Sequence, residues 1–294
     1  MAVVRITEFT DPACPWAYSA EPFRRRLDWL YGDSLEWNVR LVGLSESPAY
    51  YEDKGFGTKE LSAAYKRIAH DHGMPIDTSE RPRMSASITA CRAVVAARRE
   101  APERKRVLLR RLRVRTFRGE LLDEQATIDG AARDAGIDPD ELARWIADPD
   151  TEEALREDMA AARQPMPAAL VLDERLANWS GGQRYTCPSY EIERIEDGVR
   201  IAVPGFQPFP VYDVITANLV PGLRRADPAE SPEEVLRWTG TPLATKEVAV
   251  ICASGQRSEV GASLVRRQGV GRVIHVVDGG VGTWERLGHP IAQG

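Results

Sequence analysis

With 294 residues, of which 43% are hydrophobic and 28% charged, the chain has the composition of a folded protein with one large or two modest domains. Its formal net charge of −5 argues against bulk binding of nucleic acid or of an anionic membrane surface. No apolar stretch approaches the roughly 18 residues of a membrane span, and no basic and apolar leader precedes the first predicted strand, so we expect a cytoplasmic protein.

The cysteines are too few for a disulfide scaffold in a chain of this length, and in a reducing compartment they are expected to be free thiols. They are Cys14, Cys91, Cys187 and Cys252. Cys91 lies among small apolar residues at helical spacing and is predicted to be a core residue.

Cys14 lies between a predicted strand over residues 3–9 and a predicted helix over residues 21–31. A cysteine at such a turn sits at a helix N-terminus, where free N–H groups and the helix dipole stabilise the thiolate. Pro15 fits the first helical turn because its missing N–H would have no partner there. We therefore predict that Cys14 is a nucleophile.

Residues 11–18 read DPACPWAY. This motif after a first strand resembles the active-site motif of the DsbA superfamily of thioredoxin-like proteins, which includes a cytosolic FrnE-like branch, kappa-class glutathione transferases and 2-hydroxychromene-2-carboxylate isomerase. Redox members of that superfamily carry Cys-Pro-Trp-Cys, whereas Ala17 stands here at the second cysteine position. Cys14 can form a mixed disulfide with a substrate or with a small thiol such as glutathione or mycothiol, but a neighbouring cysteine cannot resolve it.

An alternating segment over residues 35–44 predicts a second strand, parallel to the first. Residues 58–165 then change to helical periodicity, and the resemblance implies that this all-helical block is inserted between the second and third main strands. Within the block, residues 104–115 are strongly basic. Their acidic neighbours favour a solvated helix face over a nucleic-acid contact.

The sheet is predicted to resume near residues 185–192 and to continue through a hairpin turn at 197–198. By position, Pro188 resembles the cis-proline that opens the third main strand of thioredoxin-like proteins and lies against the active cysteine. The resemblance then places Cys187 beside Cys14, where it can replace the missing second cysteine. An ordinary packing role for Cys187 stays open as the alternative.

The same resemblance implies the residues that bind the substrate. Pro15, Trp16 and Tyr18 follow the nucleophile and are expected to shape its pocket, and Thr186 belongs to the backbone segment before Pro188 that is free to pair with a substrate strand.

Near the C-terminus, residues 248–251 form an apolar run typical of a buried parallel strand, and the loop that follows begins with Cys252. The loop resembles the rhodanese active-site loop Cys-x-x-Gly-x-Arg, which would make Cys252 an acidified persulfide carrier and place Arg257 at an anion nest. Residues 273–277 predict another strand, and residues 279–284, GGVGTW, resemble the rhodanese C-terminal signature. The first half of a rhodanese domain has no counterpart upstream.

The predicted fold class is therefore α/β: a thioredoxin-like sheet with an inserted all-helical block, plus a C-terminal rhodanese-like half domain. The DsbA-like domain is expected over residues 1–240 and the partial rhodanese-like segment over residues 246–294. This segment must dock on the first domain, pair with another chain or be a remnant, because so small a half-sheet exposes apolar edges.

The leading functional prediction is a DsbA-family thiol–disulfide oxidoreductase that acts through Cys14, with Pro188 positioning a protein or small-molecule disulfide and Cys187 as a candidate resolving thiol. Sulfur transfer from Cys252 to Cys14 is a further hypothesis. The alternatives are a glutathione- or mycothiol-dependent transferase or isomerase of the kappa type, and a non-catalytic protein that binds clients. No bound cofactor, metal, nucleic acid or membrane is predicted, and a homodimer stays open.

Overall fold

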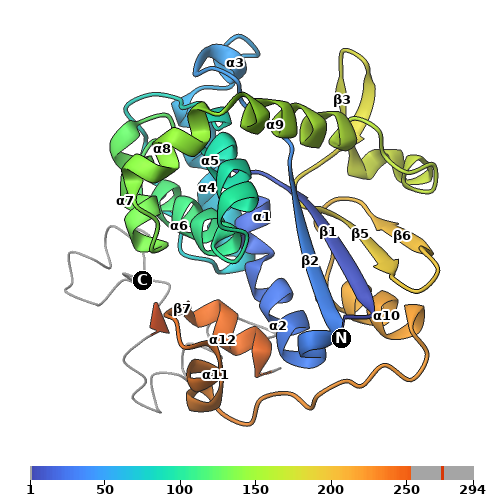
Figure 1. Ribbon diagram of the computed structural model, residues 1–294. Coiled ribbons are helices and arrows are strands. Elements are labelled where there is room, and N and C mark those ends of the chain that lie inside the picture. Colours follow the sequence, from blue (N-terminus) through green and yellow to red (C-terminus); the bar gives the residue numbers. More distant parts are fainter. Residues whose placement is uncertain (1, 253–272, 275–294) are drawn as a thin grey trace.

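The computed structural model describes residues 2–252 and 273–274 (Figure 1). Its main sheet has four strands in the order β2-β1-β5-β6. The β1–β2 pair is parallel, whereas β5 is antiparallel to both β1 and β6. The strands are β1 (Val4–Thr10), β2 (Leu35–Leu41), β5 (Ser189–Arg194) and β6 (Arg200–Val203). This arrangement confirms the predicted thioredoxin-like sheet.

Two helices cover one face of the sheet, and both come from segments that were predicted to be helical. They are α2 (Glu21–Tyr31), which joins β1 to β2, and α10 (Phe209–Leu219), which follows β6. Val4 and Ile6 of β1 point toward them and are buried with Tyr212 of α10. The alternation of β1 therefore places its apolar side chains between the sheet and these helices.

In the chain, a block of helices follows β2 and precedes the second half of the sheet, as predicted. In space the block lies beside the sheet (Figure 1). Its last helix packs against β2, whose Val39 and Leu41 join the apolar core of the block. The helices are α3 (Ala49–Glu52), α4 (Thr58–His72), α5 (Ile88–Glu100), α6 (Lys105–Phe117), α7 (Gln125–Asp134), α8 (Pro139–Ala147) and α9 (Pro149–Ala162).

Two features after α9 were absent from the sequence prediction. A 3-10 helix, η2 (Ala169–Arg175), leads into a hairpin of β3 (Leu176–Trp179) and β4 (Gly182–Tyr185). This hairpin forms its own small sheet, and β4 ends two residues before Cys187.

The basic helix α6 is not the solvated face that was predicted. The side chain of Arg113 is only 1% exposed and binds Glu8, Thr10 and Glu21. Arg110 is also buried and binds Glu247 through two N–H···O contacts of 2.8 Å. The sequence prediction failed because these carboxylates are far from α6 in the chain, and only tertiary pairing makes burial of the arginines tolerable.

The predicted strand over residues 248–251 is wrong, because these residues belong to the helix α12 (Thr245–Ile251). A short apolar run cannot by its periodicity distinguish a buried strand from a buried helix. The helix begins where the N–H of Ala244 donates to Oε2 of Glu247 at 2.7 Å, which satisfies a donor at its N-terminus.

The described part of the C-terminal segment packs on the thioredoxin-like domain. Helix α12 packs against α2 and against α11 (Pro232–Thr239), as Figure 1 shows. Strand β7 (Leu243–Ala244) pairs in parallel with β8 (Val273–Ile274), which falls within the predicted strand 273–277. Among the described residues, no helix combines the length and apolarity needed to cross a membrane.

Candidate active site

Cys14 lies between the end of β1 and the first residue of a five-residue helix, α1 (Pro15–Ser19). The turn before it is held by Asp11, whose Oδ1 accepts from the N–H of Ala13 at 2.8 Å and whose carbonyl accepts from the N–H of Cys14 at 3.2 Å. Pro15 occupies the first helical position, as predicted. The sequence thus places the sulfur at a helix N-terminus, although this helix is a separate one that precedes α2.

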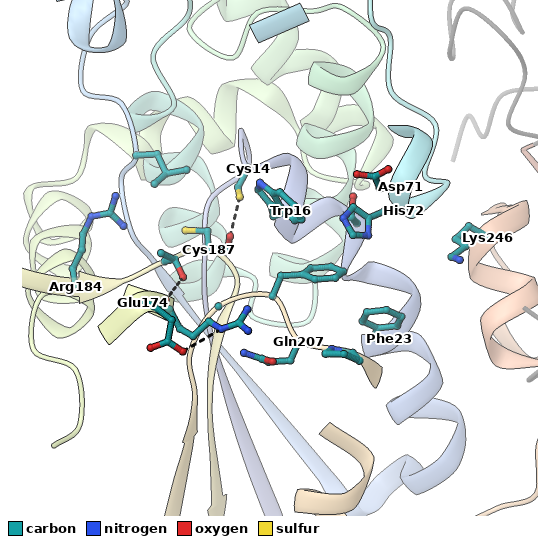
Figure 2. Close-up of a pocket in the computed structure, with 17 residues that line it drawn as sticks. Cys14, Trp16, Phe23, Asp71, His72, Glu174, Arg184, Cys187, Gln207 and Lys246 are labelled. Atoms are coloured by element: carbon teal, nitrogen blue, oxygen red, sulfur yellow. Dashed lines mark hydrogen bonds and ion pairs between the residues drawn. The ribbon is translucent and has the colours of Figure 1, made fainter. Parts of the chain in front are cut away.

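Cys187 lies against Cys14, as the family resemblance implied. The peptide bond between Cys187 and Pro188 is cis. The Sγ–H of Cys14 donates to the carbonyl oxygen of Cys187 at 3.2 Å, and Figure 2 shows the two sulfur-bearing side chains next to each other. They share an apolar cluster with Phe9 and Tyr185, whose ring centroids are 4.5 Å apart. The chain that leaves the β3–β4 hairpin therefore brings Cys187 next to Cys14, from which it is separated by 173 residues in the sequence.

The two thiols have opposite pKa shifts. Burial raises the pKa of Cys14, but hydrogen bonds from the side chain of Cys187 and from the N–H groups of Ala17 and Trp16 outweigh it, so the net pKa is lowered. Burial, followed by the bond to Cys14 and its charge, raises the pKa of Cys187 well above its usual range. The pair therefore favours a thiolate on Cys14 and a protonated donor on Cys187.

Asp11 is a buried acid beside this pair. Its Oδ2 accepts from the N–H of Leu44 at 2.8 Å, from Oγ of Ser87 at 2.9 Å and from Sγ of Cys91 at 3.4 Å. Burial raises its pKa despite these bonds, and its negative charge opposes ionisation of Cys14. Cys91 is buried, as predicted, and burial raises its pKa, so it is a packing residue rather than a reactive one.

A cavity of about 830 Å³ opens at Cys14 and Cys187 (Figure 2). Trp16 forms its central wall, with its ring centroid 5.0 Å from that of His72 and 5.6 Å from that of Phe206. The lining residues are Cys14, Trp16, Ser19, Phe23, Leu44, Asp71, His72, Glu174, Arg175, Arg184, Thr186, Cys187, Gly205, Phe206, Gln207, Pro208 and Lys246.

Cationic side chains line this cavity from two separate parts of the chain. Arg175 and Arg184 come from η2 and the β3–β4 hairpin, and Lys246 comes from the docked C-terminal helix. The Nη1 of Arg184 donates to the carbonyl of Tyr185 at 2.8 Å. Burial lowers the pKa of Lys246, and within residues 2–252 no carboxylate forms an ion pair with its ammonium group. Arg175 is paired with Glu174 at 3.6 Å, so Arg184 and Lys246 are the charges that the described part of the cavity offers to an anionic molecule.

A second cavity, of about 280 Å³, lies on the other side of Trp16 and shares Cys14, Trp16 and Leu44 with the first. Its other walls come mainly from α3, α4 and their surrounding loops and are largely apolar, including Tyr51 and Tyr65. The nucleophile thus borders both a charged space and an apolar one.

The predicted binding residues have different placements. Trp16 and Thr186 line the large cavity and Pro15 the apolar one. The prediction for Tyr18 is wrong, because its ring is 1% exposed and stacks on Phe117 at 4.7 Å within the core. Helix α1 turns this side chain away from both cavities.

The loop that was predicted to acidify Cys252 lies outside the described residues, and the described neighbours of this thiol act in the opposite direction. Cys252 caps the C-terminus of α12 and is half-buried, and burial together with the charges of Glu234 and Glu233 raises its pKa to about 11. A helix C-terminus stabilises cations rather than a thiolate. Arg257 and the glycine-rich signature at 279–284 lie outside the described residues.

Sequence reasoning missed the cationic side chains of the large cavity and the role of Asp11 as an acceptor. The only sequence signal for Asp11 was its place in the DPACPW motif, since an aspartate before a proline and a small residue favours such a turn. Lys246 had no signal, because its position depends on how the C-terminal segment docks.

Three comparisons with known proteins bear on the fold. A family model described as the DSBA-like thioredoxin domain matches residues 5–186. The ClpXP adapter protein SpxH of Halalkalibacterium halodurans is 26% identical over 256 residues, which cover 84% of this chain and 78% of that protein.

Solved structures resemble the fold. The cytosolic disulfide reductase DsbM of Pseudomonas aeruginosa aligns with a TM-score of 0.54 and 20% identity, covering 74% of this chain and 100% of that one. A probable DsbA oxidoreductase of Streptomyces coelicolor aligns with a TM-score of 0.54 and 18% identity, covering 77% and 100% of the two chains.

Proposed function

Because the chain belongs to the family of proteins with a DSBA-like thioredoxin domain, we propose that it is a thiol–disulfide oxidoreductase whose nucleophile is Cys14. The observation that carries this proposal is the placement of the Cys14 sulfur at the start of α1, next to Cys187 and to the cis peptide bond before Pro188. Hydrogen bonds from Cys187 and from two backbone N–H groups favour the thiolate that disulfide exchange requires.

In the first step, the Cys14 thiolate attacks one sulfur of a disulfide R–S–S–R′. The bond between Cys14 and RS forms, the substrate S–S bond breaks, and R′S⁻ leaves and takes up a proton. In the second step, a thiolate from solution attacks the RS sulfur, a new disulfide leaves, and the Cys14 thiolate is restored. After these two steps R′ is a free thiol and R forms a mixed disulfide with the entering thiol. A second entering thiolate attacks that mixed disulfide, releases RS⁻ and forms the disulfide of the two entering thiols, so the substrate gains the two electrons that these thiols lose.

We assign the second step to a low-molecular-weight thiol rather than to Cys187. The pKa of Cys187 is raised well above its usual range, first by burial and then by its bond to Cys14, so its thiolate is scarce at neutral pH. In this assignment Cys187 is a positioning residue, which donates a hydrogen bond to the Cys14 thiolate.

Glutathione fits the cavity better than mycothiol as that co-substrate. Glutathione carries a carboxylate at each end, whereas mycothiol has none. Lys246 on one helix and Arg184 on the opposite segment supply cations to which two carboxylates can bind while the thiol lies at Cys14. We place this reaction in the cytoplasm, where free thiols and glutathione persist. The homodimer stays a prediction.

A second candidate function is that of an adapter that binds clients without redox chemistry. The similarity to an adapter protein, SpxH, favours it, as does the replacement of the second motif cysteine by Ala17. The apolar cavity beside Cys14 could hold a client side chain. Sulfur transfer from Cys252 has no place in either function, because the raised pKa of that thiol disfavours a nucleophilic sulfur.

Intact-protein mass spectrometry after mild oxidation tests the proposal, with and without glutathione and with peptide mapping of the linked cysteines. A glutathione adduct on Cys14, lost in Cys14→Ser and retained in Cys187→Ser, supports the monothiol route. A bond between Cys14 and Cys187 makes the pair a split dithiol centre and overturns the role given to Cys187. If Cys14 reacts as slowly as an ordinary buried thiol, the result favours the adapter function.

A further inference from the structure

A third cavity, of about 190 Å³, lies where α2, α6 and the segment before β7 meet, and it shares no lining residue with the two cavities at Cys14. Five of its nine lining residues are arginines. The lining residues are Arg24, Arg25, Arg106, Val107, Arg110, Arg111, Thr239, Thr241 and Pro242. This is the environment of the basic segment 104–115, which the redox proposal does not use.

The arginines outnumber the carboxylates that bind them. Arg24 binds Glu21 and Asp28, Arg106 binds the same Asp28, and Arg25 and Arg110 both bind Glu247. Four of the five guanidinium groups therefore share three carboxylates. Glu21 also lies 3.9 Å from Arg110 and binds Arg113, which is outside the pocket lining. The lining has a net positive charge.

Arg111 is the least neutralised member of this set. It is 6% exposed, and among the described residues its Nε donates only to the backbone carbonyl of Asp134, at 3.3 Å. The carboxylate of Asp134 is bound instead by Arg115, at 2.7 Å. Burial and then repulsion by Arg110 lower the pKa of Arg111. The same two causes lower the pKa of Arg25 to about 10.

The cavity also offers hydroxyl groups next to these guanidinium groups. Oγ1 of Thr239 accepts from Nη1 of Arg25 at 3.3 Å and lies 3.0 Å from Oγ1 of Thr241. Guanidinium forks and hydroxyls together match the oxygens of a tetrahedral anion, which accept several charge-assisted hydrogen bonds at once. A phosphate group, with a small substituent attached, fits a volume of about 190 Å³.

We propose that this pocket between α2, α6 and the residues before β7 binds a phosphate group, either as inorganic phosphate or as the end of a small phosphate monoester. The anion binds between Arg25, Arg106 and Arg111 and neutralises the positive charge that the carboxylates nearby leave uncompensated. Both sources present the same oxygens to the pocket, and the size of the attached group distinguishes them.

Isothermal titration calorimetry with inorganic phosphate and, separately, with O-phospho-L-serine tests this, in a chloride buffer matched for ionic strength. The test variant is Arg111→Gln. Among the described residues the side chain of Arg111 donates to a backbone carbonyl and has no ion pair, so the substitution breaks none there. The control is Arg144→Gln on α8, which removes the same charge from a side chain that is 73% exposed.

We expect the wild type and Arg144→Gln to bind phosphate with the same affinity and Arg111→Gln to bind it about tenfold more weakly, the loss of one charge-assisted hydrogen bond. Tighter binding of phosphoserine than of phosphate identifies a monoester as the ligand, and the reverse identifies the free ion. Thr241→Val, in which every arginine pair is kept, is expected to weaken binding about threefold. Wild-type protein that binds neither compound, or equal affinity in Arg111→Gln and Arg144→Gln, overturns the proposal.

Discussion

The Sγ of Cys14 lies 3.2 Å from the carbonyl oxygen of Cys187, although 173 residues separate the two in the chain. This contact brings together a thiol whose pKa is lowered and one whose pKa is raised. Burial acts against ionisation at both. The difference comes from the hydrogen bonds that the Cys14 thiolate accepts from the side chain of Cys187 and from the N–H groups of Ala17 and Trp16, and the carbonyl contact is not one of them. The reactivity of Cys14 is therefore controlled by its neighbours and can be changed in either direction.

Cys187→Ala removes a hydrogen-bond donor to the Cys14 thiolate and is expected to raise the pKa of Cys14. The rate of iodoacetamide alkylation of Cys14 follows the thiolate fraction, so its midpoint moves to higher pH and the rate at neutral pH falls. The pH profile of alkylation, measured by peptide mass spectrometry, checks this. Cys252→Ala makes the same substitution at a cysteine outside the site, and an equal shift in that variant would contradict the assigned contact.

Asp11→Asn is expected to move the same midpoint in the opposite direction. The Asp11 charge opposes ionisation of Cys14, so its removal lowers the pKa of that thiol and speeds alkylation at neutral pH. The variant also puts an amide where Oδ2 accepts from Leu44 and Ser87, which destabilises the fold by about 1–3 kcal/mol. The control Asp71→Asn removes a charge at the cavity rim, where solvent screens it, and an unchanged midpoint in Asp11→Asn would disprove the electrostatic role.

Lys246→Gln is expected to raise the KM for glutathione about three- to tenfold and to leave kcat unchanged. The rise in KM corresponds to the loss of one charge-assisted hydrogen bond between the partly exposed Lys246 and a carboxylate of glutathione. The value of kcat stays the same because this bond does not involve the reacting sulfur atoms. Steady-state turnover with glutathione is compared with turnover with 2-mercaptoethanol, which has no carboxylate, and Lys246→Arg serves as the charge-retaining control. An equal rise in KM for both thiols would show that Lys246 shapes the cavity and does not bind a carboxylate.

Glu247→Ala is expected to lower the free energy of unfolding by about 3–5 kcal/mol. The side chain is fully buried, and its removal leaves Arg25 charged without its ion pair and leaves Arg110 with only a 3.9 Å pair to Glu21. Urea denaturation followed by tryptophan fluorescence measures the change. Glu153→Ala breaks an exposed 2.7 Å ion pair with Arg156 and is expected to cost under about 1 kcal/mol. Similar losses in the two variants would mean that the buried pairs add nothing to stability.

The first strand, the nucleophile and the cis-proline could be predicted because each depends on a local signal. The alternation of β1 and the motif around Cys14 specify a strand, a turn and a helix start from neighbouring residues alone. Pro188 was found by family resemblance, and the structure confirms its cis bond. The predicted domain boundary near residue 240 stays a prediction.

What the sequence did not reveal depends on residues that meet only in the folded chain. The arginines of α6 were interpreted as solvated because Glu8, Glu21 and Glu247 are distant in sequence. The apolar run 248–251 was interpreted as a strand because its period is the same for a buried helix. The cationic lining at Lys246 required the docking of α12, which no local pattern indicates.

Helix α12 carries Lys246 toward the cysteine cavity and Glu247 toward α6, so adjacent residues connect the C-terminal segment to two different parts of the domain. The docking of this segment therefore depends on residues that are far apart in the chain and must be inherited together. A recombination event that exchanged only the C-terminal segment between relatives would separate Glu247 from Arg110 and leave that buried guanidinium with only its 3.9 Å pair to Glu21. We expect lineages to keep or lose these two residues together, so that their joint presence in a homologue marks a C-terminal segment docked in the same way.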